Sequence, residues 1–224
     1  MPGLAVFDLD GTLTAHDTYK RFLRTRLRAR PWRALRCVSL PWHYWVARRT
    51  RRDHVWLKLK ALGAVVAGSQ RAELRRFAVA FGESVVDTDV PARARARIEA
   101  HRAAGDTLVL CSASFDFYVE AIGEQLGFDA VICTRSAWRD DRLVAAIDGE
   151  NCFGEEKIRR LENLVTELGA GHRPHVSAYT DHHSDVPLLE WANTPVAVSP
   201  TTRMSRIAEE RGYAVEQWHA QSAF

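Results

Sequence analysis

This sequence lacks clustered cysteines and long apolar runs. Its four cysteines, Cys37, Cys111, Cys133 and Cys152, form no CxxC pair and have no metal-ligand spacing with histidine, which argues against a disulfide framework and a cysteine metal site. No apolar run reaches the ~18 residues that a membrane-spanning helix needs. The N-terminal letters MPGLAVFDLDGT place acids where a signal peptide needs apolar residues. We therefore expect a cytoplasmic protein with free thiols.

Acidic residues are almost missing from residues 20–60. This segment carries 14 Lys or Arg and one acid, Asp53, for a charge of +13 within a chain of net charge +3, which leaves −10 for the remainder. Such asymmetry bears on partners more than on fold. An anionic substrate or an anionic membrane surface fits it. A nucleic acid is not expected as a partner, because no recognised nucleic-acid motif accompanies the basic residues.

Tryptophan gathers in the same basic segment, at Trp32, Trp42, Trp45 and Trp56. Tryptophan favours the headgroup region of a bilayer, and each basic residue near an anionic leaflet contributes about 1 kcal/mol before screening. The stretch 37–47 is too short to span a membrane but long enough to lie in its interface. These features predict a protein peripheral to the inner face of the membrane. Equally compatible is a segment whose tryptophans pack internally and whose arginines are a solvated face.

Short apolar segments alternate with amphipathic ones along most of the chain. Strands are predicted at 4–8, 106–112, 129–134, 174–180 and 195–198, and a hairpin over 136–147 that turns at Asp140–Asp141. Helices are predicted at 17–30, 69–84, 91–104, 115–126, 155–168, 184–193 and 201–211. The alternation predicts an α/β fold with a parallel sheet. Asp17 or Thr18 is expected to cap the first helix and Ser69 the second.

The strongest motif is Asp8-Leu9-Asp10-Gly11-Thr12, directly after the first apolar strand. Two carboxylates one residue apart converge only where the loop turns, and Gly11 permits that turn. Asp8 can attack phosphorus as a carboxylate. Asp10 can protonate the leaving oxygen and later deprotonate the attacking water. The motif therefore predicts hydrolysis of a phosphate ester in two displacements through an aspartyl-phosphate.

Two further segments supply groups suited to a phosphoryl group. Ser112 ends the strand LVLCSAS, where its hydroxyl and the exposed backbone amides around Ala113 can hold phosphoryl oxygens. Ser114 is the alternative for this role, or a helix N-cap. Lys157 falls in the first turn of a predicted helix, where the helix dipole disfavours a cation. That cost suggests that Lys157 balances the charge of Asp8 and the phosphoryl group.

The fourth polar segment, Tyr179–Asp185, follows another apolar strand. Asp181 and Asp185 can bind or orient Mg²⁺, which prefers a few carboxylates together with water and phosphate oxygens. His182 and His183 stand between them and invite a zinc interpretation. Adjacent side chains on irregular backbone rarely reach one ion, so they are expected to be loop histidines.

These four segments, in this order, resemble the haloacid dehalogenase superfamily over residues 4–14 and about 105–215. The stretches LVLCSASFDFYVEAIGEQLG, NCFGEEKIRRLE and AYTDHHSDVPLLEWANTPVAVSP resemble subfamily IB, which includes phosphoserine phosphatases, histidinol-phosphate phosphatases and the phosphatidylglycerophosphatase C group. The resemblance implies a Rossmann-like core, with helices on both faces of the sheet, formed by 1–14 and 89–224. It also implies a helical type-1 cap formed by 15–88.

The resemblance also implies roles for single residues. Asp8 is the nucleophile and Asp10 the acid/base, while Ser112 and Lys157 bind the phosphoryl group. The implied Mg²⁺ ligands are Asp8, the backbone of Asp10 and Asp181, with Asp185 in support.

This chain departs from the family pattern in three places. Thr180 stands where relatives often have Gly, and His182-His183 replace small residues, which puts metal access in doubt. The cap is the least similar part. In it, Asp17 falls near the position where phosphoserine phosphatases bind the substrate ammonium, although an N-cap role explains it equally well.

The predicted function is that of a Mg²⁺-dependent phosphomonoesterase acting on a small metabolite phosphate or a lipid-linked phosphate. One alternative is a phosphotransferase or mutase that passes the aspartyl-phosphate to an alcohol. Another is a non-catalytic phosphate-sensing module of the receiver type, against which Asp10 argues, since an acid two residues after the nucleophile allows turnover.

Overall fold

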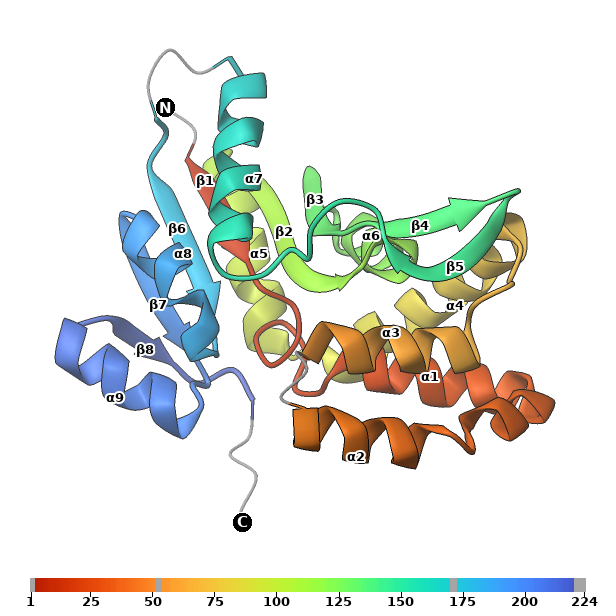
Figure 1. Cartoon of the computed structure of the whole chain (residues 1–224). Helices are drawn as coiled ribbons and strands as arrows, with labels where there is room; N and C mark the ends of the chain where they lie inside the picture. Colours follow the sequence, from red (N-terminus) through yellow and green to blue (C-terminus); the bar gives the residue numbers. More distant parts are fainter. Residues whose placement is uncertain (1–2, 51–53, 170–172, 220–224) are drawn as a thin grey trace.

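A six-stranded parallel sheet lies at the centre of the computed structural model, which describes residues 3–50, 54–169 and 173–219 (Figure 1). The strand order is β3-β2-β1-β6-β7-β8. The bounds are β1 Leu4–Phe7, β2 Thr107–Phe115, β3 Ala130–Thr134, β6 Val176–Thr180, β7 Thr194–Val198 and β8 Ala214–Glu216. Every neighbouring pair is parallel, which confirms the predicted α/β class.

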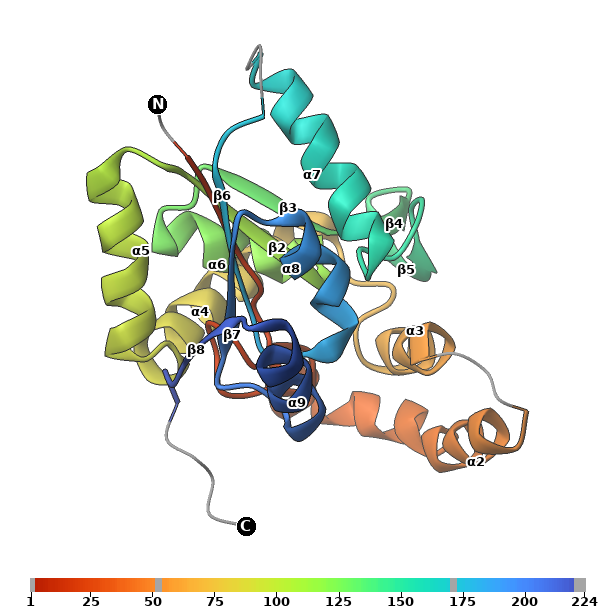
Figure 2. The ribbon, with the colours of Figure 1, turned by 90° about the vertical axis from the view of Figure 1, so that its left-hand side faces the viewer.

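Strand β1 is buried on both faces, as expected for the centre of a parallel sheet. Ala5 and Phe7 pack with helices α4 (Arg71–Asp89), α5 (Ala92–Ala104) and α6 (Asp116–Leu126). Leu4 and Val6 pack with α7 (Glu155–Glu167), α8 (Val186–Trp191) and α9 (Thr202–Arg211). Figure 2 shows the two sets of helices on opposite sides of the strands, so the predicted helical layers on both faces are confirmed.

The segment between β1 and β2 is helical. It comprises α1 (Thr18–Ala29), the 3₁₀ helix η1 (Pro31–Cys37), α2 (Leu40–Thr50), α3 (His54–Val65) and α4. Helices α1 to α3 lie together beside the sheet (Figure 1), whereas α4 packs along α6. The helical insertion predicted after the first strand is therefore present. Its limits at 15–88, with 1–14 and 89–224 as the core, stay a prediction.

A two-stranded hairpin, β4 (Ser136–Arg139) and β5 (Arg142–Ile147), reaches over α3 (Figure 1). It turns at Asp140 and Asp141, whose φ angles of 48° and 57° are those of a two-residue hairpin turn, as predicted. Leu143 joins the hairpin to the loop between α3 and α4, since its carbonyl accepts a hydrogen bond from Gly68 N (2.8 Å) and its N–H donates to Ser69 O (3.0 Å). The hairpin thus braces α3 over the edge of the core.

Two local predictions differ from the structure. Ser69 does not cap α4, which begins after Gln70, because the Ser69 hydroxyl donates to Val66 O (2.7 Å) and accepts from Arg26 (3.0 Å). The three-residue edge strand β8 was not predicted. In the described part of the chain, no helix is both long enough and apolar enough to cross a membrane.

Candidate active site

Parallel register brings the predicted polar segments to one edge of the sheet. Phe7 of β1 pairs with Leu110 of β2 on one side and with Tyr179 of β6 on the other. The residues that follow these three positions therefore lie toward the same edge of the sheet. Asp8, Ser112 and Asp181 all lie within two residues of them, at the carboxyl ends of three adjacent strands, where sites form in such sheets.

Asp8 is buried and bound to a single ammonium. Lys157 Nζ donates to Asp8 Oδ1 (2.6 Å) and also to Asp185 Oδ2 (2.7 Å). Asp8 Oδ2 receives no hydrogen bond from any residue that the structure describes. Burial raises the pKa of Asp8, with the Lys157 ammonium opposing. Burial alone would lower the pKa of Lys157, but the carboxylates of Asp185 and Asp8 raise it above its usual value. Lys157 is therefore an ammonium.

Asp10 is fixed by hydroxyl and amide donors. Its Oδ1 accepts from the backbone N and the Oγ1 of Thr18, both at 2.6 Å. Its Oδ2 accepts from Ser114 Oγ (2.7 Å). Burial raises the pKa of the Asp10 carboxyl, and these hydrogen bonds hold the increase down. Ser114 therefore supports Asp10, while the N-cap of α6 is Phe115.

Gly11 forms the turn that follows the two carboxylates. Its φ is +89°, and a Cβ atom there would lie 2.4 Å from Asp181 Oδ2. Thr12 Oγ1 donates to Asp181 Oδ1 (3.1 Å), so the loop after β1 cradles the Asp181 carboxylate. Burial raises the pKa of Asp181 to about 6.

Ser112 and Ala113 occupy the end of β2 beside these carboxylates. Ser112 is buried, and its hydroxyl accepts from Ser114 N (3.1 Å). The Ala113 carbonyl accepts from Thr134 Oγ1 (2.8 Å) and from Lys58 Nζ (2.6 Å). The phosphate-binding roles of Ser112 and Ala113 stay predictions.

Lys58, on α3, was not recognised from the sequence. Its ammonium lies 4.4 Å from the centre of the Phe115 ring and 5.6 Å from that of Tyr19. Burial lowers the pKa of Lys58 to about 8, against the opposing charges of Asp10 and Asp17. No sequence signal marks it, because it is one of 14 cations in a basic segment. Its side chain connects the cap to the end of strand β2 at Ala113.

Two other predicted residues, Asp17 and His182, have local partners, whereas the buried Nδ1 of His183 has no hydrogen-bond partner among the described residues. Asp17 is the N-cap of α1, accepting from Lys20 N (2.9 Å), and forms an ion pair with Lys20. A substrate role for Asp17 stays a prediction. His182 Nδ1 interacts with Ser184 Oγ (2.9 Å), and the His183 ring lies 4.0 Å from that of His182. Within the described residues, no three His, Cys, Asp or Glu side chains form a metal cluster.

The donor chemistry nevertheless fits a Mg²⁺ ion. Asp8, Asp181 and Asp185 are buried with one ammonium, Lys157, among them, so negative charge is in excess. Asp185 Oδ2 is occupied by Lys157 and by Thr180 Oγ1 (2.9 Å), which gives the unusual Thr180 a structural role. Two carboxylates, a backbone carbonyl and water are a set that Mg²⁺ accepts without a third side chain.

The fold and this strand-end arrangement agree with comparisons to known proteins. The sequence profile of the haloacid dehalogenase-like hydrolase family matches residues 5–190. The chain belongs to that family and is a hydrolase, which confirms the resemblance inferred from its motifs.

Individual relatives match along nearly the whole chain. Protein CicA of Caulobacter vibrioides is 31% identical over 223 residues, covering 96% of this chain and 86% of CicA. A histidinol-phosphatase of Neisseria meningitidis is 25% identical and covers 96% of this chain and 98% of its own length. A solved structure from Bordetella pertussis Tohama I, of unknown function, superposes with a TM-score of 0.78 at 28% identity, covering 98% of this chain and 100% of that one.

Proposed function

We propose that this hydrolase is a Mg²⁺-dependent phosphomonoesterase that forms an aspartyl-phosphate on Asp8. The observation that carries the proposal is the state of that side chain. One carboxylate oxygen is bound by Lys157 at 2.6 Å, and the other has no donor among the described residues. The ammonium aligns the carboxylate and leaves one oxygen for in-line attack on phosphorus. Expulsion of the alcohol then leaves the phosphoryl group on Asp8.

Asp10 is proposed as the general acid and base. Thr18 and Ser114 fix its carboxyl group two residues from the nucleophile. The raised pKa of Asp10 favours a carboxyl that carries a proton to the leaving alkoxide. Once the alcohol has gone, the carboxylate accepts a proton from the water that attacks the aspartyl-phosphate. Inorganic phosphate leaves, and Asp8 and Asp10 return to their initial states.

The phosphoryl oxygens are proposed to bind Lys157, Ser112 and the backbone at Ala113. Mg²⁺ would be held by Asp8, the Asp10 carbonyl and Asp181, with Asp185 positioning Lys157. The ion supplies positive charge that lets two anions, the nucleophile and the phosphate ester, approach each other. It also offsets the burial that raises the pKa of Asp8 and Asp181.

The proposed substrate is a small metabolite phosphate whose alcohol portion faces the cap. The relative named histidinol-phosphatase supports this class. A cap group beside Ala113 is the ammonium of Lys58, whose Nζ donates to the Ala113 carbonyl and whose charge is opposed by that of Asp10. We assign Lys58 to binding of the leaving portion of the substrate, with an anionic or strongly polar group preferred.

A turnover screen tests the proposed function. The panel contains histidinol phosphate, phosphoserine, sugar phosphates and phosphatidylglycerol phosphate, each assayed for inorganic phosphate with Mg²⁺ and after chelation, without added acceptor alcohol. We expect phosphate release from at least one soluble member, only with metal, and none from Asp8→Asn. Phosphate release by metal-stripped enzyme or by Asp8→Asn contradicts the proposal. Transfer to an added alcohol without any release to water would instead support the phosphotransferase alternative.

A further inference from the structure

An exposed apolar stripe runs along η1 and α2. Leu35 lies on η1, Val38 lies in the turn between η1 and α2, and Trp42 and Trp45 lie three residues apart on one side of α2. Val38 is 76% exposed, Trp42 62% and Trp45 47%, and no residue of α2 is buried. The rings of Trp42 and Trp45 stack on each other at 4.9 Å rather than packing into the protein. Large apolar side chains exposed together mark an interaction site.

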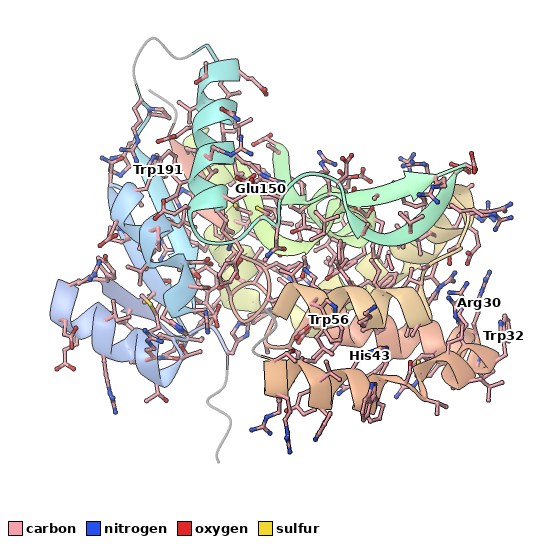
Figure 3. All side chains as sticks on the ribbon, viewed as in Figure 1. Arg30, Trp32, His43, Trp56, Glu150 and Trp191 are labelled. Atoms are coloured by element: carbon pink, nitrogen blue, oxygen red, sulfur yellow. The ribbon has the colours of Figure 1, made fainter. Side chains whose placement is uncertain are left out.

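Two further aromatic side chains, one on η1 and one on α2, are also exposed. Trp32 is 63% exposed and Tyr44 53%. Figure 3 shows Trp32 beside Arg30 at the end of the insertion farthest from the sheet, while α2 forms the outer edge of the molecule (Figure 1). Trp56 differs, because it lies half-buried on α3, with the ring of His43 5.4 Å away. We define the α2 surface as Trp32, Leu35, Val38, Trp42, Tyr44 and Trp45.

Arginine side chains accompany the aromatic residues of the α2 surface. Arg49 lies 4.8 Å from the ring centre of Trp45, and Arg48 lies 6.0 Å from that of Tyr44. No acidic residue occurs in the sequence between Thr18 and Thr50. Among the described residues, no ion pair involves Arg48 or Arg49, whereas Arg26 and Arg30 are paired with Glu73. The surface therefore presents aromatic rings together with arginines that form no ion pair among the described residues.

We propose that the α2 surface docks on an anionic lipid bilayer. A bilayer interface accepts both components at once: tryptophan and tyrosine rings enter the headgroup region, and arginine side chains meet lipid phosphates. Leu35 and Val38 fit the same partner, since they can enter the acyl boundary below the headgroups. A nucleic acid would use the arginines but leave the aliphatic side chains exposed to water. Docking goes beyond the proposed phosphatase activity and does not depend on it.

Vesicle flotation tests the docking surface. The full chain is mixed with phosphatidylcholine vesicles that either contain or lack phosphatidylglycerol, over a salt series. We expect binding to the anionic vesicles at low salt, weaker binding as salt rises, and little binding to neutral vesicles. Replacing Arg48 and Arg49 by Gln should weaken binding by roughly tenfold to thirtyfold. Trp42→Ala with Trp45→Ala should weaken it comparably, and quenching of tryptophan fluorescence by brominated lipid should fall.

Matched variants separate docking from general charge. Arg203→Gln with Arg206→Gln removes two exposed cations from α9, on another side of the molecule (Figures 1 and 2). This control should float like the wild type, and all variants should keep the wild-type melting temperature and activity on a soluble phosphate ester. The proposal is wrong if the wild type does not bind anionic vesicles at low salt. It is equally wrong if the α9 and α2 arginine variants lose the same affinity, or if neutral vesicles bind as well as anionic ones.

Discussion

Asp8 and Asp10, the two aspartates of the loop after β1, have different hydrogen-bond partners. These partners determine the expected effect of replacing each residue. Asp8 accepts from an ammonium through one oxygen and has no donor to the other among the described residues, whereas Asp10 accepts from the hydroxyl and amide of Thr18 and the hydroxyl of Ser114. The first environment suits a nucleophile, and the second suits a group that gains and loses a proton. The two aspartates are therefore expected to have different roles, Asp8 as the nucleophile and Asp10 as the acid and base.

Asp10→Asn should slow phosphorylation most for poor leaving groups. General acid catalysis typically contributes ~10²–10⁴-fold, and p-nitrophenolate needs little of it, because it leaves without a proton. Single-turnover phosphorylation should therefore fall steeply with an alkyl phosphate and only slightly with p-nitrophenyl phosphate. Lys157→Ala serves as the comparison, since loss of a group on the phosphoryl oxygens should slow both. Equal slowing of the two substrates by Asp10→Asn would remove the acid role.

Lys58 should make substrate binding sensitive to pH. Burial lowers its pKa to about 8, so the ammonium is lost as the pH rises through that value, and KM for an anionic substrate should rise with it. Lys58→Arg keeps its charge and should flatten this rise. Below about pH 8, Lys58→Met should raise KM by roughly tenfold or more, the worth of a charged hydrogen bond, with little change in kcat, and its KM should approach that of the wild type at higher pH. An identical KM–pH profile for wild type and Lys58→Arg would exclude Lys58 from substrate binding.

At the scale of elements, the strand-end motifs were predictable because each follows a short apolar run. The strand predicted at 4–8 is β1, and parallel pairing alone then brings Asp8 and Asp181 to one edge. Helices α2 and α3 were not predicted. α3 contacts α1, η1, α2 and β5, so it has no polar face whose periodicity could be recognised.

The N-cap predicted at Ser69 was wrong because tertiary contacts use its hydroxyl group. Ser69 has the residue type of an N-cap, yet its hydroxyl is taken by Val66 O and Arg26, contacts that depend on tertiary structure. The positions of Lys58 and Thr18 in the site also depend on tertiary structure, because they follow from packing of the insertion against the end of β2.

The loop after β1 should tolerate no side chain at its glycine. Gly11→Ala combines a positive φ with a Cβ 2.4 Å from Asp181 Oδ2. The matched control is Gly105→Ala, at φ +78° with no atom within 4 Å of the new Cβ. The control should lose ~1–2 kcal/mol of unfolding free energy from backbone strain alone. Gly11→Ala should lose more and should also bind Mg²⁺ more weakly, because Asp181 must move. Equal losses with unchanged Mg²⁺ affinity would contradict the cradle.

At the scale of the whole molecule, buried negative charge at the sheet edge should link stability to pH and metal. The pKa of Asp181 is about 6 in the folded protein against an ordinary 3.8, so the folded state holds this proton more tightly than the unfolded chain. Its contribution to stability is complete below the ordinary pKa and is lost as the pH rises through about 6.

Mg²⁺ should reverse that loss. The ion binds the carboxylate form, so added Mg²⁺ should raise the melting temperature more at about pH 7.5 than at about pH 5. Differential scanning fluorimetry with and without the ion measures both effects. Asp181→Asn should abolish most of the Mg²⁺-dependent increase. A larger Mg²⁺ effect at the lower pH would show that the metal does not bind these carboxylates.

The most direct measurement concerns the bond proposed to form on Asp8. Asp10→Asn is mixed with p-nitrophenyl phosphate and Mg²⁺, quenched in acid within a single turnover, digested and analysed by mass spectrometry. Because this variant can form the phospho-enzyme but loses the base for its hydrolysis, the peptide containing Asp8 should gain the mass of one phosphoryl group. Asp8→Asn with Asp10→Asn should gain none. Product release without any phosphorylated Asp8, or phosphate found on another residue, would contradict the account.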